Sequence, residues 1–148
     1  EKREMKVSNV LQDKGNDVFT VRPEETINTL THRLRALRVG AVIVSRDGNT
    51  VDGIISERDV TYGLAEHGSE LLNMKVSDLM TASVVTCSLE STISDLMKLM
   101  TQRRVRHLPV VENGKLVGII SIGDIVRYRL NEMQIEADVM RDYAIARN

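Results

Sequence analysis

The sequence predicts an α/β protein built from two tandem copies of one small unit. The first observation is an internal repeat, because residues 18–21 (Val-Phe-Thr-Val) resemble 84–87 (Val-Val-Thr-Cys), and residues 53–56 (Gly-Ile-Ile-Ser) recur as 118–121. The second observation is that each copy alternates between strand-like and helix-like apolar spacing. The third is that only 3% of the 148 residues are aromatic while 42% are hydrophobic. Aliphatic side chains must therefore form the core, which suits thin sheets covered by helices.

Each copy contains an amphipathic helix after a short opening strand. Thr26 is a typical N-cap residue for a helix that runs to about Arg38. A second helix begins just after Ser56, and its counterpart in the second copy spans about residues 122–145. The length of this last helix indicates that it protrudes or packs on a partner. Apolar residues recur on one face of the first helix in each copy: Ile27, Leu30, Leu34 and Leu37, then Ile93, Leu96, Met97 and Met100.

Two antiparallel strands follow the first helix in each copy. Good turn residues separate the two strands, with Asp-Gly in the first copy and Asn-Gly in the second. The predicted strands are residues 41–45 and 51–55, joined through 46–49, and residues 108–111 and 116–120, joined through 112–114.

These elements divide the chain into five segments. A short helix ending at Gly15 is expected near the N-terminus, and residues 77–80 are expected to form one helical turn. The segments are an N-terminal segment (1–17), a first repeat (18–66), a linker (67–83), a second repeat (84–130) and a C-terminal helical extension (131–148).

Charge, cysteine content and hydropathy argue against several classes of protein. With 20 basic and 21 acidic residues the chain has no basic excess, so we expect no nucleic-acid partner. No apolar run approaches the roughly 20 residues that span a bilayer, and no signal peptide is visible, so we expect no membrane partner. The one cysteine, Cys87, forms no internal disulfide and suits a reducing compartment. We therefore expect a cytoplasmic protein.

Catalytic motifs are missing from the sequence. We find no Gly-rich phosphate loop of the Walker type, no paired metal-ligand motif, and no Cys/His or Ser/His arrangement for a nucleophile. We therefore expect that the protein is not an enzyme and that it has no catalytic cofactor and no metal site.

Together these features resemble the cystathionine-β-synthase (CBS) domain, in the tandem pair called a Bateman module. The resemblance is carried by Thr20 and Thr86, by the two Gly-Ile-Ile-Ser-x-x-Asp blocks, and by residues 106–111 (Arg-His-Leu-Pro-Val-Val). The outer segments are similar to those of small stand-alone bacterial CBS-pair proteins. The resemblance implies two β-α-β-β-α units, related by a pseudo-twofold axis and packed through their sheets, with two clefts between them. Members commonly bind AMP, ATP, S-adenosylmethionine or NAD(H) there, and two modules often form a disk-like homodimer.

The doubled Ser-x-x-Asp motif is the main candidate for binding. Ser56 and Asp59, and likewise Ser121 and Asp124, lie where a strand passes into a helix. A carboxylate has two acceptor oxygens and can bind both hydroxyls of a ribose. The alternative is a capping box, in which the serine and the acidic residue only close the helix N-terminus. The two roles are compatible.

Basic residues precede the first long strand of the second repeat. Arg106, His107, Leu108 and Pro109 match a stretch that the family uses for phosphate and ribose contacts, and Arg104 lies close by. The alternative is a solvent-facing row of charges with a proline at a strand edge.

The opening strands and the strands before each helix supply weaker candidates. The resemblance gives Thr20 and Thr86 polar contacts to the base or ribose, although threonine is also simply common in strands. Ile55 and Ile120 are expected either beside the base or in the core. Cys87 is expected to be a buried structural residue.

The first repeat departs from the family pattern. It has no Arg, His or Pro before its strand, where Gly40 and Ala41 leave room for an adenine ring or for backbone. Arg58 is expected to supply charge across the pseudo-twofold axis, and its counterpart is Gly123. The two sites are therefore unequal, and the sequence predicts one strong site centred on Asp124 and a second that is weaker or differently filled.

The function that we expect is a sensor or regulatory module that binds an adenine nucleotide (AMP, ATP or NAD(H)) between its repeats. Such a protein is expected to form a homodimer and to act through an effector protein of unknown identity, because the sequence holds no effector domain. The alternative is a homodimeric interaction module with vestigial clefts. The plain first-repeat segment and the apolar spacing of Ile135, Val139 and Met140 in the last helix favour this alternative.

Overall fold

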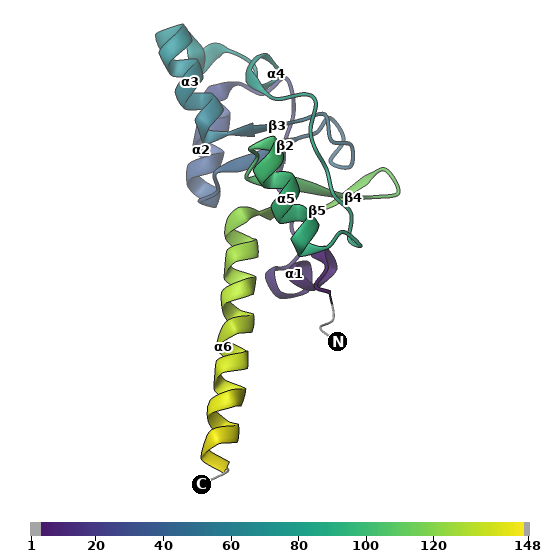
Figure 1. Cartoon of the computed structure of the whole chain (residues 1–148). Helices are drawn as coiled ribbons and strands as arrows, with labels where there is room; N and C mark the ends of the chain where they lie inside the picture. Colours follow the sequence, from purple (N-terminus) through teal and green to yellow (C-terminus); the bar gives the residue numbers. More distant parts are fainter. Residues whose placement is uncertain (1–3, 147–148) are drawn as a thin grey trace.

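The computed structural model describes residues 4–146, and its helices and strands follow the predicted order (Figure 1). Threonine side chains cap the helices α2 and α5, since Thr26 accepts the N–H of Thr29 and Thr92 accepts that of Asp95. The elements are α1 (Val7–Lys14), β1 (Thr20–Val21), α2 (Ile27–Leu37), β2 (Ala41–Val44), β3 (Gly53–Ser56), α3 (Glu57–His67), the 3-10 helix η1 (Gly68–Asn73), α4 (Val76–Leu79), α5 (Ile93–Arg103), β4 (His107–Glu112), β5 (Lys115–Ser121) and α6 (Ile122–Ala146).

The two repeats form separate small sheets. In the first, β1 pairs in parallel with β2, and β2 pairs antiparallel with β3, with Ala41 opposite Ser56. In the second, β4 pairs antiparallel with β5, with His107 opposite Ser121. Both pairings bring the start of one strand beside the serine that precedes a helix. This register positions the candidate site.

The predicted opening strand at 84–87 is reduced to a single parallel bridge between Cys87 and Val110. Cys87 still donates its N–H to the carbonyl of Pro109 and accepts the N–H of Val111. Pro109 has no N–H, so it cannot donate the next ladder bond that a longer parallel strand needs. Pro109, one of the residues that carry the resemblance to the family, therefore also limits the length of this strand.

The two hydrophobic cores exchange segments. The first core contains Leu71 and Val76, which belong to the segment predicted as a linker. The second core contains Val7, Val10 and Leu11 of α1, although α1 precedes the first repeat in the chain. Each repeat is therefore completed by the segment that precedes the other repeat. The domain boundaries drawn above stay a prediction.

Matching backbone hydrogen bonds hold the exchanged segments. Ile27 donates its N–H to Met74 (2.9 Å), and Ile93 donates its N–H to Met5 at the same distance. The sequence carries a signal for this exchange that the repeat search missed, because Met-Lys-Val-Ser at residues 5–8 recurs at 74–77. The repeat is therefore longer at its N-terminal end than the pattern of strands and helices indicated.

Candidate functional site

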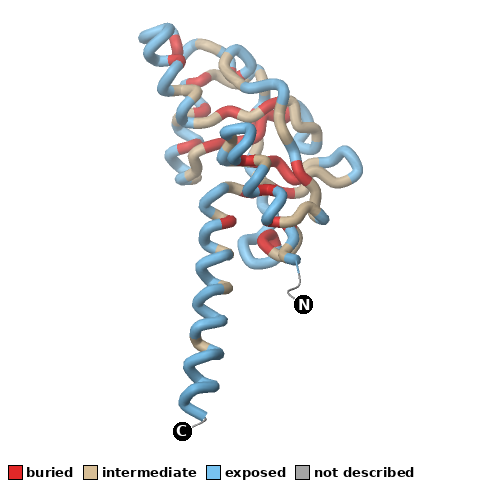
Figure 2. Tube along the Cα trace, viewed as in Figure 1, coloured by how far each residue is buried: buried red, intermediate tan, exposed pale blue. Residues whose placement is uncertain are grey.

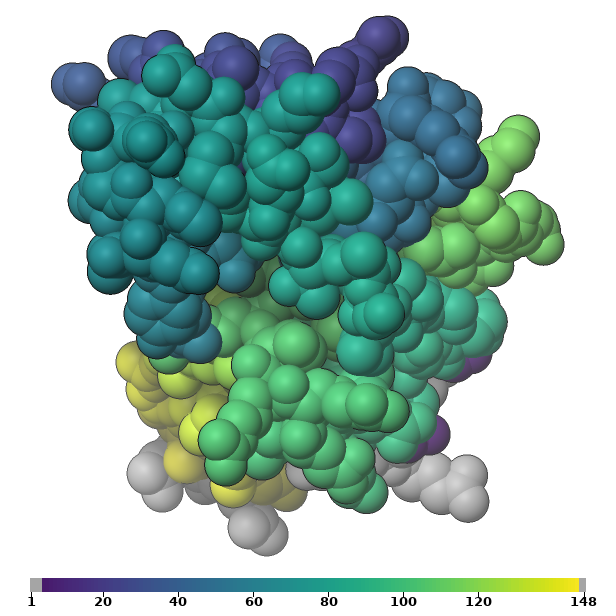
Figure 3. Space-filling model, turned by 90° about the horizontal axis from the view of Figure 1, so that it is seen from above, coloured from purple at the N-terminus to yellow at the C-terminus, as the bar shows by residue number. Residues whose placement is uncertain are grey.

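A cavity of about 280 Å³ lies where the two repeats meet. Figure 3 shows a recess between the blue and teal surface of the first repeat and the green surface of the second. Residues of both repeats and of the segment between them contribute to its walls. They are Gly40, Ala41, Ile54, Ser56, Glu57, Arg58, Asp59, Thr81, Ser83, Val84, Val85, Arg104, Val105, Arg106 and His107.

The first repeat supplies a carboxylate at the junction of β3 and α3. Asp59 Oδ2 accepts the backbone N–H of Ser56 (2.8 Å) and its hydroxyl (3.1 Å), while Ser56 Oγ accepts the N–H of Asp59 (3.4 Å). This is a capping box, as one of the two alternatives requires. Among residues 4–146 no donor bonds to Oδ1 of Asp59, so capping leaves this oxygen for a ligand. The capping role and a binding role are compatible here.

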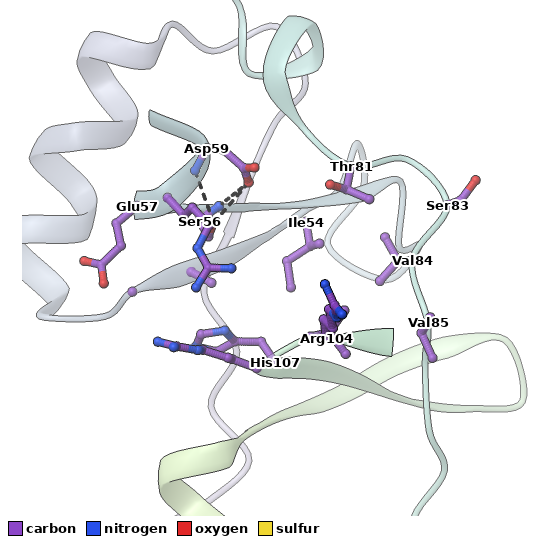
Figure 4. A pocket seen from close by; sticks show the side chains of 15 residues that line it. Ile54, Ser56, Glu57, Asp59, Thr81, Ser83, Val84, Val85, Arg104 and His107 are labelled. Atoms are coloured by element: carbon purple, nitrogen blue, oxygen red, sulfur yellow. Dashed lines mark hydrogen bonds between the residues drawn. The ribbon is translucent and has the colours of Figure 1, made fainter. Parts of the chain in front are cut away.

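The second repeat supplies positive charge from the turn between α5 and β4. Figure 4 shows Arg104 and His107 on the side of the cavity opposite Ser56 and Asp59. Arg106 is fixed by its backbone, whose carbonyl accepts the N–H of Ile122 (2.9 Å). A guanidinium group can bind phosphate oxygens through two parallel hydrogen bonds. The cavity therefore has a carboxylate on one wall and basic side chains on the other.

Burial lowers the pKa of His107 below its ordinary value of 6.5. The charges of Asp124 and Glu57 act in the opposite direction, and those of Lys14 and Arg106 add to the lowering. The imidazole is therefore neutral at pH 7, where it both donates and accepts a hydrogen bond. The permanent positive charges of the cavity come from its arginines.

The remaining walls include residues that the sequence did not identify. Ile54 lines the cavity, whereas Ile55 is fully buried in the core, which is the second of the two places expected for Ile55. Thr81 holds the chain against β3 through two backbone hydrogen bonds with Ile54 (2.9 and 3.0 Å). This contact brings Val84 and Val85 to the cavity. No local pattern in the sequence marks such a contact between distant segments.

A family model described as "CBS domain" matches residues 7–66 and again residues 76–131. The chain belongs to the CBS domain family. It is 30% identical over 145 residues to the CBS domain-containing protein CBSX3, mitochondrial, of Arabidopsis thaliana, which covers 93% of this chain and 70% of that protein. The resemblance and the fold class stated above are thus confirmed.

Solved structures of CBS proteins superpose closely on this chain. The CBS-domain containing protein ATU1752 from Agrobacterium tumefaciens is 45% identical with a TM-score of 0.82, over 84% of this chain and 99% of that one. The CBS domain pair of protein MJ0100 was solved in complex with 5-methylthioadenosine and S-adenosyl-L-methionine. It is 20% identical with a TM-score of 0.77, over 88% of this chain and 99% of that one, and therefore shows the shared fold alone.

The second Ser-x-x-Asp motif of this CBS pair is occupied by the protein itself. Asp124 Oδ2 accepts the Lys14 ammonium at 2.5 Å, and Lys14 Nζ also donates to the carbonyl of Ile119 (2.8 Å). The Arg127 guanidinium lies 3.6 Å from Oδ1. The serine of the motif, Ser121, completes a capping box through its N–H (2.9 Å). A cation therefore lies beside each oxygen of Asp124.

Asp124 is consequently shielded from solvent, with only 10% of its side chain exposed. Burial alone raises the pKa of this carboxyl, but the hydrogen bonds from Lys14 and Ser121 and the charge of Lys14 outweigh it and hold the pKa below 3.8. These ion pairs weigh against a strong site centred on Asp124, which stays a prediction. The basic residues of the second repeat lie in the cavity that Asp59 lines, and the ammonium of Lys14 lies where a sugar hydroxyl would bind Asp124.

Several other predicted site residues of the CBS pair also lie away from the cavity. Leu108 and Pro109 are buried residues of β4, which explains their apolar character without a ligand. Thr20 lines a different hollow with Arg22 and Arg33. Thr86 is exposed next to Cys87, which is buried as expected. Seven of the predicted residues do line the cavity: Gly40, Ala41, Ser56, Arg58, Asp59, Arg106 and His107.

Within residues 4–146, no group of three His, Cys, Asp or Glu side chains is arranged to hold a metal ion. Within the same residues, no helix has the length and hydropathy needed to cross a membrane.

Proposed function

We propose that this CBS pair binds one adenine nucleotide per chain in the cavity between its repeats and that it acts as a regulatory module. The observation that carries the proposal is the placement of Asp59 opposite Arg104 and His107 across a cavity of about 280 Å³, which Arg106 also lines. A nucleotide presents two sugar hydroxyls and an anionic phosphate at opposite ends of one small molecule. The two walls match these two ends.

Each part of the nucleotide has a complementary wall. The free Oδ1 of Asp59 accepts the ribose hydroxyls, and the arginines bind the phosphate. The adenine ring lies against the apolar side chains of Ile54 and Val84, beside the small residue Ala41. Binding requires no catalytic group, so the proposed role is recognition and not turnover.

The charges and the size of the cavity favour a phosphorylated mononucleotide. Arg58, Arg104 and Arg106 outnumber the acidic residues Glu57 and Asp59 along the walls. This balance favours an anionic ligand over S-adenosylmethionine, whose sulfonium is positive. The cavity volume of about 280 Å³ lies just below the range of about 300–1,000 Å³ for ligand pockets. AMP and ADP are therefore preferred to the dinucleotide NAD(H).

Calorimetry with AMP, ADP, ATP, NADH and S-adenosylmethionine tests this proposal. The wild-type chain is expected to bind one AMP or ADP, and Asp59→Ala is expected to weaken that binding at least about tenfold, because each hydrogen bond to a charged group contributes roughly 1.5–3 kcal/mol. Asp124→Ala is the matched control and should change the affinity by less than about twofold.

Asp59→Asn separates ligand contact from helix capping. Asparagine keeps an acceptor for the N–H of Ser56 but loses the charge that faces the ligand. A loss of affinity in this variant with unchanged thermal stability supports direct contact. Absence of binding below about millimolar in the wild-type chain, or a larger loss in Asp124→Ala than in Asp59→Ala, refutes the proposal.

An interaction module is the second candidate function, and one observation favours it. The helix α6 exposes a long apolar surface that has no role in the proposed nucleotide site. The two functions are compatible, because the cavity and most of α6 are formed by different residues.

A further inference from the structure

The helix α6 projects from the body of the protein along most of its length (Figure 1). Of its 25 residues, Ile125 is the only buried one, and it lies in the first turn. Figure 2 shows the rest of the helix almost entirely in the colour of exposed residues. Helices in water gain most of their stability from packing an apolar face. A helix of this length with so little packing therefore indicates that something covers it.

One face of α6 carries a regular apolar row, which we call the α6 seam. Its members are separated alternately by four and three residues, which is the spacing of the a and d positions of a coiled coil. The four larger members are each more than half exposed. The α6 seam consists of Val126, Leu130, Met133, Ala137, Met140 and Ala144.

We propose that the α6 seam is the interface with a second copy of this chain, in a parallel two-stranded coiled coil. The alternating spacing is sustained from the first turns of the helix nearly to its end, so the same row on a second copy can pack against it knob into hole. Ala137 and Ala144 are small and allow the two helices to approach closely. The inference does not depend on the proposed nucleotide site.

Charges beside the α6 seam favour the parallel orientation. Glu136 precedes Ala137 and occupies a g position, while Arg141 follows Met140 and occupies an e position. In a parallel, in-register pair, Glu136 of one chain faces Arg141 of the other, which is the attractive g–e pair of coiled coils. An antiparallel pair centred on the α6 seam would instead place Glu136 beside Glu136, and Arg127 beside Arg141. Like charges at these positions oppose that arrangement.

Disulfide trapping tests the orientation directly. Met133→Cys places a thiol at the centre of the α6 seam, and in a parallel pair the two cysteines fall within the Cα separation of about 7 Å that a disulfide requires. Asn131→Cys is the control, because Asn131 is exposed on a different face of the same helix. The native Cys87 does not interfere, since burial raises the pKa of its thiol to about 12.

The expected result is a wild-type chain that sediments at twice its monomer mass. Mild oxidation should link Met133→Cys into covalent dimers and leave Asn131→Cys unlinked. A wild-type chain that stays monomeric at every concentration, or equal linking of the two cysteine variants, overturns the proposal.

Charge reversal provides a second readout that needs no oxidation. Glu136→Arg should shift the sedimentation equilibrium towards monomer, because the new arginine faces Arg141 of the other chain. The double variant Glu136→Arg/Arg141→Glu should restore the dimer by exchanging the two charges. All of these positions are exposed, so circular dichroism of the monomer checks that the fold is intact. Dimerisation that is equal in the wild type and in Glu136→Arg overturns the parallel pairing.

Discussion

The two aspartates of the Ser-x-x-Asp motifs have equivalent backbones and unequal surroundings. Both accept the N–H of their serine and cap a helix. The difference comes from a residue outside the motifs. Counted from the recurring Met-Lys-Val-Ser segments, Lys14 corresponds to Ser83. The longer, charged side chain of Lys14 reaches Asp124, whereas Ser83 lines the open cavity beside Asp59. This difference between the repeats leaves Asp59 without the lysine that pairs with Asp124.

Replacing Lys14 by the residue of the other repeat tests this account. Lys14→Ser frees the carboxylate of Asp124, so we expect a second, weaker nucleotide to bind and the first affinity to stay within about twofold. Isothermal calorimetry measures both the number of sites and their affinities. Lys98→Ser is the control, because Lys98 is an exposed lysine on α5 away from both clefts. If Lys14→Ser still binds one nucleotide per chain, with the same heat of binding as the wild type, Lys14 does not close the second cleft.

His107 should make stability depend on pH. Its folded-state pKa is lowered mainly by burial, so the unfolded chain binds a proton at a higher pH than the folded chain does. The free energy of unfolding should therefore be constant near pH 7–8 and should fall as the pH drops below about 6.5, the ordinary histidine value. The charges of Asp124 and Glu57 oppose the effect of burial on this pKa, and those of Lys14 and Arg106 add to it.

Urea denaturation between pH 7.5 and 5 measures this dependence. His107→Gln should flatten the curve over that range, while the exposed His32→Gln should leave it unchanged. A curve that is equally steep in wild type and His107→Gln would show that another group titrates.

At the scale of elements, the helices and strands themselves were predictable. Apolar spacing and capping threonines located α2 and α5, and the Asp-Gly and Asn-Gly turns located the strand pairs. The exchange of segments between cores was not predicted, because it leaves no local periodicity and its one sequence signal, the recurring Met-Lys-Val-Ser, lies outside the predicted strands and helices of the repeats. Pro109 illustrates the same limit. The sequence shows that this residue is a proline without an N–H. Its effect on the strand at 84–87 depends on which strand lies beside it, and the sequence does not show this.

The exchanged helix α1 should contribute strongly to the stability of the second repeat. Leu11 is buried in the second core and lies against Gly118, where an added Cβ would approach Leu11 Cδ1 to 2.8 Å. Leu11→Ala should therefore lower the free energy of unfolding by about 2–4 kcal/mol, the usual effect of a large-to-small change in a core.

Leu72→Ala is the matched control for this prediction. Leu72 is 45% exposed and lies in η1, so its truncation should change the free energy of unfolding by no more than about 0.5 kcal/mol. Guanidinium denaturation measures both variants. Equal effects would show that α1 is not an integral part of the second core.

At the scale of the whole molecule, the site exists only because the two repeats meet. Ser56 and Asp59 come from the first repeat, and Arg104, Arg106 and His107 from the second. A sequence motif within one repeat could indicate the carboxylate or the basic residues. It could not show that they lie on opposite walls of one cavity. The choice between Asp59 and Asp124 therefore depends on contacts between the repeats that no motif within one repeat records. A ligand that contacts both walls favours whichever arrangement of the repeats brings them closest.

The most direct test of the central claim is a crystal structure of the full chain with AMP or ADP. We expect one nucleotide per chain, with its ribose hydroxyls within hydrogen-bonding distance of Asp59 and its phosphate bound by Arg104 or Arg106. Lys14 should remain paired with Asp124. A nucleotide whose ribose is bound by Asp124, with the cavity beside Asp59 empty, would contradict the account.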